Sequence, residues 1–177
     1  DNCTILGGDF SNTTGLLPWR NNMFLALESD IENLISVGDS IEFQGCEFVS
    51  YPTYTTHSII ELPYNIYNGR VYMEQAFSMS VKPHWKNSVI SCLDSVTFED
   101  GAKIKNCYMK IDTIDVTGGN FVAYNSEITG TKILSSDATI ELHQSVLNGG
   151  NIDMYDTATL KIYDGSEIYG DVTQDGI

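Results

Sequence analysis

The chain has 177 residues, a formal net charge of −15 from 24 acidic and 9 basic side chains, and no apolar stretch near the ~18 residues that cross a membrane. This charge argues against binding to nucleic acid, which needs a basic footprint, and against attachment to anionic lipid. An apolar content of 42% indicates a folded chain, expected to be a single domain over 1–177. Gly, Asn, Asp, Ser, Thr and Tyr spread along the whole chain are typical of many short strands.

The first fifty residues carry a loose pattern. The chain begins at Asp1, without Met, as a fragment or a processed product would. Gly8-Asp9-Phe10 and Cys46-Glu47-Phe48 have the same character 38 positions apart, which is twice 19. Residues 23–27 alternate in the manner of a strand, which is the structure predicted for them. For residues 28–36 a strand and a short helix both stay open, because apolar residues there also share one helical face.

Residues 50–67 are predicted to leave the regular structure as an inserted loop. The step from Cys46 to Gly69 is 23 residues, longer than the steps that follow it. Three of the four prolines fall between 52 and 83, and five of the ten tyrosines lie in 51–72. This part of the chain therefore differs in composition from the rest.

From residue 68 onward the sequence repeats with a period of 19 residues. A four-residue segment recurs that consists of Asn, a small residue, any residue and an apolar residue. Its small residue stands at 69, 88, 107, 126 and 145, each 19 apart, and then at 166. Two apolar ladders run in phase with it. They are Val96, Ile114, Ile133, Ile152 and Val172, and Phe121, Ile140 and Leu160 with Ala123, Leu142 and Ile162 two positions on.

The repeat unit predicts the fold. Alternation as in Ile140-Glu141-Leu142 is that of a strand with one buried face. A unit of 19 residues is too short for a strand plus a crossover helix, but it fits one turn of a parallel β-solenoid. We expect an all-β, right-handed parallel β-helix with roughly eight coils, since parallel crossovers are overwhelmingly right-handed. The left-handed hexapeptide solenoid needs a six-residue sub-period, which this sequence lacks.

This fold makes predictions about side chains. Asn68, Asn87, Asn106 and Asn125 should stack in one column. The side chains expected to be buried are Phe121, Ile133, Ile140, Leu142, Ile152, Leu160 and Ile162. Cys46 and Cys107 fall about three coils apart, roughly 14 Å, beyond the ~7 Å that a disulfide allows. Cys92 aligns with Ile111, and Cys3 has no partner either, so all four cysteines are expected to be free thiols. Free thiols favour folding in the cytoplasm, as virion proteins do. No Cys or His spacing predicts a metal site.

Two segments carry a family resemblance. Ile104-Lys105-Asn106-Cys107-Tyr108-Met109 and Phe43-Gln44-Gly45-Cys46-Glu47-Phe48 resemble the repeats of the right-handed parallel β-helix superfamily typified by pectate lyases and phage tailspikes. The resemblance covers residues 68–177 closely and 1–50 loosely. It implies the architecture, and it says little about activity because this fold hosts many functions.

Aromatic side chains near the loop are the predicted binding residues. Tyr and Trp offer flat apolar faces with a polar handle, which suit stacking on sugar rings. The alternative is that these residues pack the loop onto the barrel. The candidates for glycan binding are Tyr51, Tyr54, Tyr64, Tyr67, Tyr72 and Trp85.

Acidic and histidine side chains give weaker signals. Asp137 and Asp156 share a turn column about 5 Å apart, a spacing that can hold Ca²⁺ or raise one pKa, although Asp in turns is usually turn chemistry. Asp94, Glu99 and Asp100 lie close enough in sequence to supply a glycosidase pair. His57 and His143 have no partner in the sequence, and His84 adjoins Trp85. We assign no catalytic residue, metal or cofactor.

These observations predict a structural and attachment module of a virion fibre or tailspike, or of a similar surface appendage, located on the virion or cell surface. Its expected partners are a host-surface glycan and, in assembly, a homotrimer or larger virion structure. The alternative is a polysaccharide hydrolase or lyase domain with carboxylates beside residues 50–85, although a surface at −15 repels a polyanionic substrate. A third possibility is a fragment of a larger surface protein whose function lies elsewhere.

Overall fold

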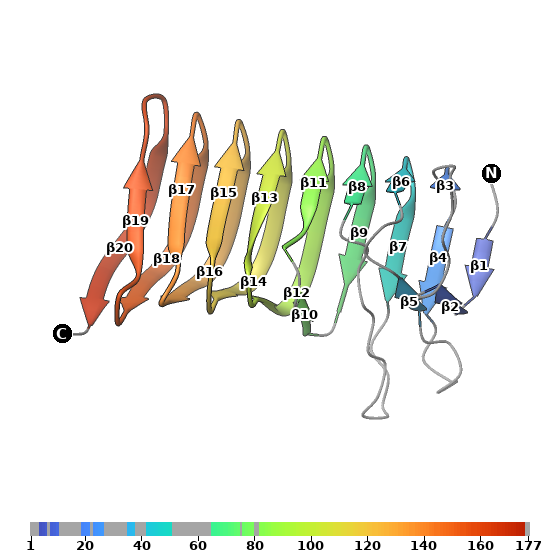
Figure 1. The fold of residues 1–177 in the computed structure, drawn as a ribbon, viewed down its shortest axis with the longest axis horizontal. Coiled ribbons are helices and arrows are strands. Elements are labelled where there is room, and N and C mark those ends of the chain that lie inside the picture. Colours follow the sequence, from blue (N-terminus) through green and yellow to red (C-terminus); the bar gives the residue numbers. More distant parts are fainter. Residues whose placement is uncertain are drawn as a thin grey trace.

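The computed structural model describes residues 4–6, 8–10, 19–21, 23–26, 35–37, 42–50, 65–74, 76–79 and 82–175. All of their regular structure is β-strand, and none of them forms a helix capable of spanning a membrane. Neighbouring strands pair in parallel and follow one another along the axis of a rod, as Figure 1 shows. The predicted all-β parallel solenoid is confirmed.

The first and largest sheet has ten strands, in an order that advances one coil at a time. Its C-terminal strands are the longest because each runs around a corner of the coil. The strands are β1 (Thr4–Leu6), β4 (Met23–Ala26), β7 (Glu47–Ser50), β9 (Arg70–Met73), β10 (Phe77–Met79), β12 (Val89–Phe98), β14 (Tyr108–Val116), β16 (Glu127–Ser136), β18 (Val146–Tyr155) and β20 (Glu167–Asp175).

A second sheet of eight strands lies on another side of the coil, and a third has two strands. The second sheet contains β3 (Trp19–Arg20), β6 (Glu42–Gln44), β8 (Asn65–Tyr67), β11 (His84–Lys86), β13 (Gly101–Lys105), β15 (Asn120–Tyr124), β17 (Thr139–His143) and β19 (Thr159–Ile162). The third sheet pairs β2 (Gly8–Phe10) with β5 (Ile35–Val37).

The strand register follows the sequence repeat. Ile90 lies opposite Met109, and Met109 lies opposite Ile128, each one coil of 19 residues away. The solenoid has about six turns of this spacing, slightly fewer than the roughly eight expected from the repeat. The spacing is longer from β4 to β9, where Met23 pairs with Glu47 and Glu47 pairs with Arg70, steps of 24 and 23 residues, while Thr4 pairs with Met23 at a step of 19.

The N-terminal predictions are only partly covered by the described residues. Strand β4 confirms the strand predicted within 23–27. In the segment left open, β5 begins at Ile35, so its end is strand, whereas residues 28–34 lie outside the described part. Residues 51–64 of the predicted loop lie outside it as well.

A left-handed backbone conformation recurs at the corner that leads from the second sheet into the first. Asn68, Asn87, Asn106 and Asn125 have φ values of 55°, 52°, 52° and 46°. Asn tolerates this region better than other residues with a Cβ, which explains its recurrence. The side-chain amides bond from coil to coil, with Nδ2 to Oδ1 distances of 3.0, 2.9 and 3.0 Å. The predicted asparagine column is confirmed.

A second polar column lies directly after the asparagines. The hydroxyl of Ser126 accepts the backbone N–H of Cys107 at 3.1 Å and donates to the carbonyl of Tyr124 at 2.8 Å. Ser88 and Ser145 do the same for their neighbouring coils. These three side chains are buried, so their hydroxyls satisfy backbone groups that water does not reach.

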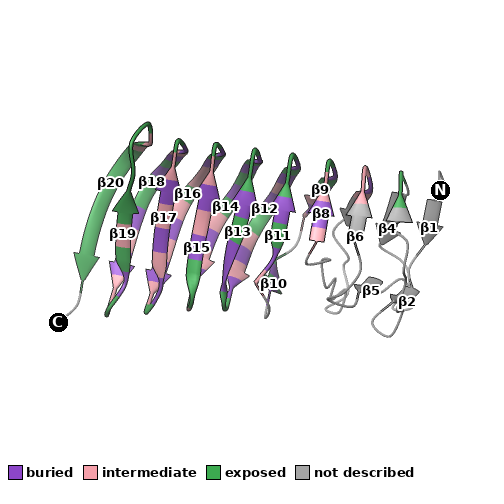
Figure 2. Cartoon of the chain, turned by 45° about the horizontal axis from the view of Figure 1, so that its top comes forward, coloured by how far each residue is buried: buried purple, intermediate pink, exposed green. Residues whose placement is uncertain are grey.

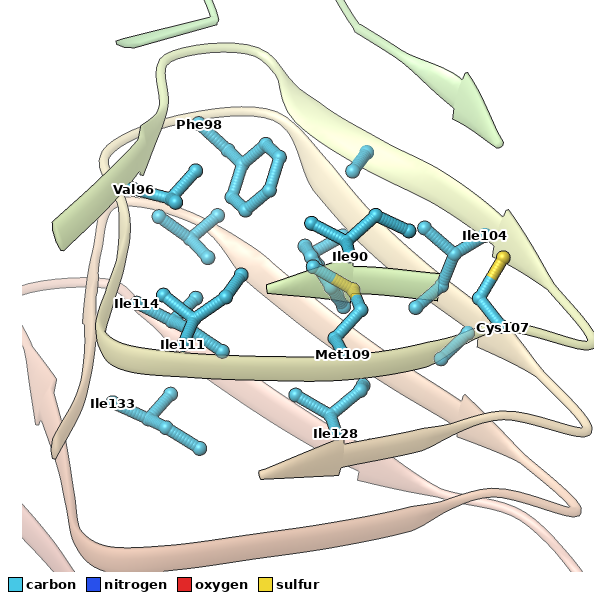
Figure 3. Close-up of a cluster of buried hydrophobic side chains, with 14 of the residues drawn as sticks. Ile90, Val96, Phe98, Ile104, Cys107, Met109, Ile111, Ile114, Ile128 and Ile133 are labelled. Carbon is cyan, nitrogen blue, oxygen red and sulfur yellow. The ribbon is translucent and has the colours of Figure 1, made fainter. Parts of the chain in front are cut away.

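The core is a continuous column of apolar side chains inside the coils. Figure 3 shows Ile90, Met109 and Ile128 pointing into the same interior from successive strands. Trp85, Phe98 and Phe121 meet edge to face, with ring centroids 6.0 and 5.4 Å apart. Cys46, Cys92 and Cys107 are buried and form no disulfide with one another, and Cys92 lies opposite Ile111, as predicted, whereas Cys3 lies outside the described residues.

The C-terminal coil corrects one part of the predicted core. Phe121, Ile133, Ile140, Leu142 and Ile152 are buried as expected. Leu160 is half-buried, however, and Ile162 is 54% exposed although it pairs with Leu142. Strands β19 and β20 are the last described strands of their sheets, so each pairs with a neighbour on one side only (Figure 2). The prediction that Ile162 is buried was wrong because it assumed a neighbour on both sides.

Candidate functional site

The predicted glycan-binding aromatics do not form one exposed group. Tyr51, Tyr54 and Tyr64 lie outside the described residues. Tyr67 and Tyr72 are half-buried, and the hydroxyl of Tyr72 donates to Glu74 Oε1 at 2.8 Å.

Trp85 requires a correction. Its side chain is 1% exposed and packs edge to face against Phe98 in the core. In the three-residue strand β11 the middle side chain faces inward, and His84 and Lys86 face solvent. Trp85 is therefore a core residue, and its ring has no face free for a sugar.

The acidic turn column is built by turn chemistry. Asp137 and Asp156 adopt φ values of 52° and 53°, the left-handed conformation that Asp tolerates. Asp137 Oδ1 accepts the hydroxyl of Thr157 at 2.9 Å and its backbone N–H at 3.4 Å. The described residues contain no group of three or more His, Cys, Asp or Glu side chains arranged to hold a metal ion.

The acids near the loop are also accounted for. Asp94 Oδ1 accepts the backbone N–H of Ser95 at 2.8 Å, a local turn interaction. Glu99 and Asp100 are exposed at the turn that leads from β12 into β13.

Another carboxyl group has a more unusual setting. Asp115 on β14 is half-buried, and this burial raises its pKa. Asp115 pairs with Thr97 in the preceding coil and with Leu134 in the following coil. Leu134 in turn pairs with Asp153, one coil further on. Two coils are about 9–10 Å, so the Cα atoms of Asp115 and Asp153 lie about that far apart on one face of the sheet. Asp153 accepts the hydroxyl of Thr173 and lies 3.8 Å from Lys132 Nζ.

The outer face of the second sheet carries a stack of aromatic rings. Tyr124, His143 and Tyr163 come from three successive coils. The Tyr124 and His143 rings are 4.6 Å apart with planes at 15°, and the His143 and Tyr163 rings are 4.1 Å apart with planes at 8°. Within the described residues, no further ring stacks beyond Tyr163, whose side chain is 44% exposed.

An open hollow lies beside this stack. It has a volume of about 540 Å³ and is lined by Tyr124, His143, Gln144, Ile162, Tyr163 and Asp164. The hollow thus combines aromatic rings and an aliphatic side chain with an amide and a carboxylate.

Charged neighbours hold the stack in place. Glu141 accepts a hydrogen bond from Lys161 Nζ at 2.9 Å and lies 3.9 Å from His143 Nε2. The hydrogen bond from Lys161 lowers the pKa of Glu141, so this carboxylate is charged at neutral pH. Glu141 and Lys161 pair across β17 and β19 and form the outward column next to the aromatic stack.

This stack was not predicted, although the repeat contains the signal for it. His143 was expected to have no partner, but it has one ring on either side. Tyr124 lies 19 residues before it and Tyr163 lies 20 residues after it, which are single coil steps. Applying the period to outward residues as well as to core residues finds all three rings.

Comparison with known proteins finds no relative of this chain. No family model matches the chain, and neither does any curated protein or solved structure. The solenoid architecture rests on the strand pairing itself, and membership of the pectate-lyase-like superfamily stays a prediction.

Proposed function

We propose that this chain is a rod-like structural and attachment module that binds carbohydrate on the outer face of its second sheet. A fibre or tailspike of a virion, or a similar surface appendage, is the setting that suits it. The observation that carries the proposal is the aromatic stack of Tyr124, His143 and Tyr163 beside the open hollow.

The chemistry of the hollow suits a sugar. A pyranose ring has one apolar face, which stacks on an aromatic ring, and hydroxyl groups around its edge. Tyr163 offers the last ring of the stack, so a sugar can take the place of a fourth ring. Gln144 and Asp164 line the same hollow and supply acceptors for hydroxyl groups.

The rod keeps this face in a fixed geometry. Each coil is joined to the next by strand pairing, by the asparagine column and by the serine column. A preorganised surface loses little conformational freedom on binding. An attachment module needs this stiffness, because it transmits force between a particle and a surface.

A glycan-binding measurement with matched variants tests the proposal. Binding to a panel of neutral and acidic oligosaccharides is followed by calorimetry. Tyr163→Ala should weaken binding about tenfold, because each aromatic stacking contact is worth about 1–3 kcal/mol. Tyr163→Phe should retain binding. Tyr169→Ala is the control, since Tyr169 is 54% exposed in the same coil but lies on the first sheet.

Two results would overturn this function. One is a panel in which no oligosaccharide binds, and the other is binding that Tyr163→Ala leaves unchanged. Assembly as a homotrimer belongs to the same proposal and is checked by light scattering on the purified chain.

A second candidate function is polysaccharide hydrolysis, and the observation in its favour is the pair Asp115 and Asp153. A glycosidase that inverts configuration uses two carboxyl groups about 6.5–9.5 Å apart, one protonated as acid and one ionised as base. Burial raises the pKa of Asp115, which suits the acid, and Asp153 lies two coils away on the same face.

Product analysis distinguishes this candidate from attachment. Reducing ends and unsaturated products are measured after incubation with capsular and plant polysaccharides. If hydrolysis occurs at this pair, Asp115→Asn should abolish it. Asp112→Asn should preserve it, since Asp112 is exposed and bonded to Thr131 at 2.7 Å. Intact polysaccharide with the unaltered chain excludes the enzyme.

A further inference from the structure

Basic side chains gather on one part of an otherwise acidic rod. The chain has nine lysines and arginines and a net charge of −15, yet four of the nine, Lys82, Lys86, Lys103 and Lys105, lie on or beside β11 and β13. His84 pairs with Lys103, and Lys86 pairs with Lys105. Paired residues are about 4.8 Å apart, and outward neighbours along a strand are about 7 Å apart. We call His84, Lys86, Lys103 and Lys105, all of them exposed, the basic face.

No acid among the described residues neutralises the basic face. Among the described residues, the ion pairs of 4.0 Å or less join Arg70, Lys132, His143 and Lys161 to carboxylates, and none involves Lys86, Lys103 or Lys105. The flanking outward positions are Asn65 and Tyr67 on β8, and Val122 and Tyr124 on β15. The described part of this sheet therefore surrounds the face with uncharged side chains.

The arrangement is unfavourable in the free protein. Like charges directly opposite each other on neighbouring strands destabilise a sheet. The positive potential is also visible at His84, whose pKa is lowered by burial first and then by Lys103 and Lys82. Lysines at these positions weaken the fold by themselves, so a bound anion is the partner that would offset their repulsion.

One outward column connects the basic face with the aromatic stack. Lys86, Lys105, Tyr124 and His143 occupy equivalent positions in successive coils, and Tyr163 stacks next in line. Four coil steps span about 19 Å, which is long enough for several sugar units in a row. A linear ligand that follows this column meets two ammonium groups and then three rings.

We propose that the basic face binds an acidic polysaccharide that runs along this column and places carboxylate or sulfate groups on Lys86, Lys103 and Lys105. The inference rests on the proposed carbohydrate-binding function and specifies the charge of the glycan. Sugar units beyond the anionic groups contact Tyr124 and the rest of the stack.

The net charge of −15 does not prevent this binding. At physiological ionic strength the Debye length is about 8 Å, and packed sheets are about 10 Å apart. Acids on the first sheet are therefore largely screened from a ligand on the second. Repulsion of a polyanion would follow if the charge were evenly spread, but the second sheet is locally positive at β11 and β13.

Dextrans of one length test the proposal because they differ only in charge. Affinities for neutral dextran, carboxymethyl dextran and dextran sulfate are measured by calorimetry at 50 and 200 mM salt. The charged forms should bind at least roughly tenfold more tightly than the neutral form at low salt, and salt should weaken only their binding.

A pair of double variants separates the local face from the net charge. Lys86→Gln with Lys105→Gln should weaken binding of the charged dextrans roughly tenfold and leave neutral glycans unaffected. Lys110→Gln with Lys132→Gln changes the net charge equally, but both lysines lie on the first sheet, and binding should be unchanged. Thermal unfolding of both variants verifies that they fold.

Other outcomes of these binding experiments would contradict either the acidic ligand or the carbohydrate-binding function. Equal affinity for neutral and charged dextran, or equal losses in the two double variants, overturns the acidic ligand and leaves carbohydrate binding standing. Absence of binding to every glycan overturns the proposed function, and this inference falls with it. Duplex DNA that binds as tightly as dextran sulfate, with the same dependence on Lys86 and Lys105, would make the face a phosphate-binding surface and overturn the proposal.

Discussion

Asn106 donates a side-chain hydrogen bond to Asn87 in the preceding coil, with Nδ2 2.9 Å from Oδ1, and both residues have a φ of 52°. One residue type thus serves two purposes at this corner. Its short polar side chain tolerates the left-handed backbone, and its amide can donate to one coil while it accepts from the next. Asn125 continues the chain by donating to Asn106.

Replacing Asn106 should separate these two contributions. Asn106→Gly keeps the left-handed backbone but loses two side-chain hydrogen bonds, which should cost about 1–2 kcal/mol of unfolding free energy. Asn106→Ala loses the same bonds and also places a Cβ without a compensating amide at positive φ, a further cost of about 1 kcal/mol. Urea denaturation measures both. An alanine variant as stable as the glycine variant would contradict the backbone argument.

Acidic substitutions should distinguish the closed core from the open end. Ile152 is 0% exposed, so Ile152→Asp buries an unpaired charge and should lower the unfolding free energy by several kcal/mol. Ile162 also faces inward but is 54% exposed, so Ile162→Asp should cost less than about 1 kcal/mol. The melting temperatures of the two variants provide the comparison. Equal losses would mean that the last coil is covered.

The titration of His84 should reveal the positive potential of the basic face. Burial lowers its pKa below the ordinary 6.5, and Lys103 and Lys82 lower it further. The ring signal in NMR spectra, assigned with His84→Gln, should therefore titrate below pH 6.5. Lys103→Gln should move the midpoint upward without restoring the ordinary value, because burial and Lys82 remain. A midpoint that does not move would exclude Lys103 as a cause.

The same shift has a consequence for stability. The unfolded chain takes up a proton on His84 at about the ordinary pKa, while the folded chain takes it up only at lower pH. This site therefore favours unfolding as pH falls below 6.5, and it has no effect well above that pH. His84→Gln should reduce the loss of stability between neutral and mildly acidic pH, as measured by urea denaturation.

The buried thiols should be inert in the folded protein. Burial raises the pKa of Cys92 to about 11 and also raises that of Cys107, so neither forms much thiolate at pH 8. Iodoacetamide at pH 8 should leave both unmodified until urea unfolds the chain, as peptide mapping by mass spectrometry can show. Rapid native labelling at either cysteine would contradict its placement in the core.

Much of this fold is readable from the sequence alone, because in a solenoid the period of the sequence is also the contact pattern. A residue 19 positions on is the neighbour one coil away, so Asn87 and Asn106, or Cys92 and Ile111, are paired by counting. Alternation within each unit then identifies the inward positions such as Ile133 and Ile152. Local pattern and long-range contact coincide in this architecture.

Other features of this protein, such as the exposure of particular side chains, were decided by the tertiary structure and not by the 19-residue period alone. A three-residue strand such as β11 is too short for its own alternation to show that Trp85 points inward, and its pairing with Ile66 and Ile104 and its packing against Phe98 settle it. Ile162 repeats the core pattern but is exposed because its strand, β19, has a paired neighbour on one side only. The basic face and the aromatic stack can be located by applying the period to outward positions, but outward residues obey no apolar rule that marks which of them form a surface. The inward columns are selected for burial and leave a repeating signal, whereas the outward columns become surfaces only when neighbouring coils bring them together.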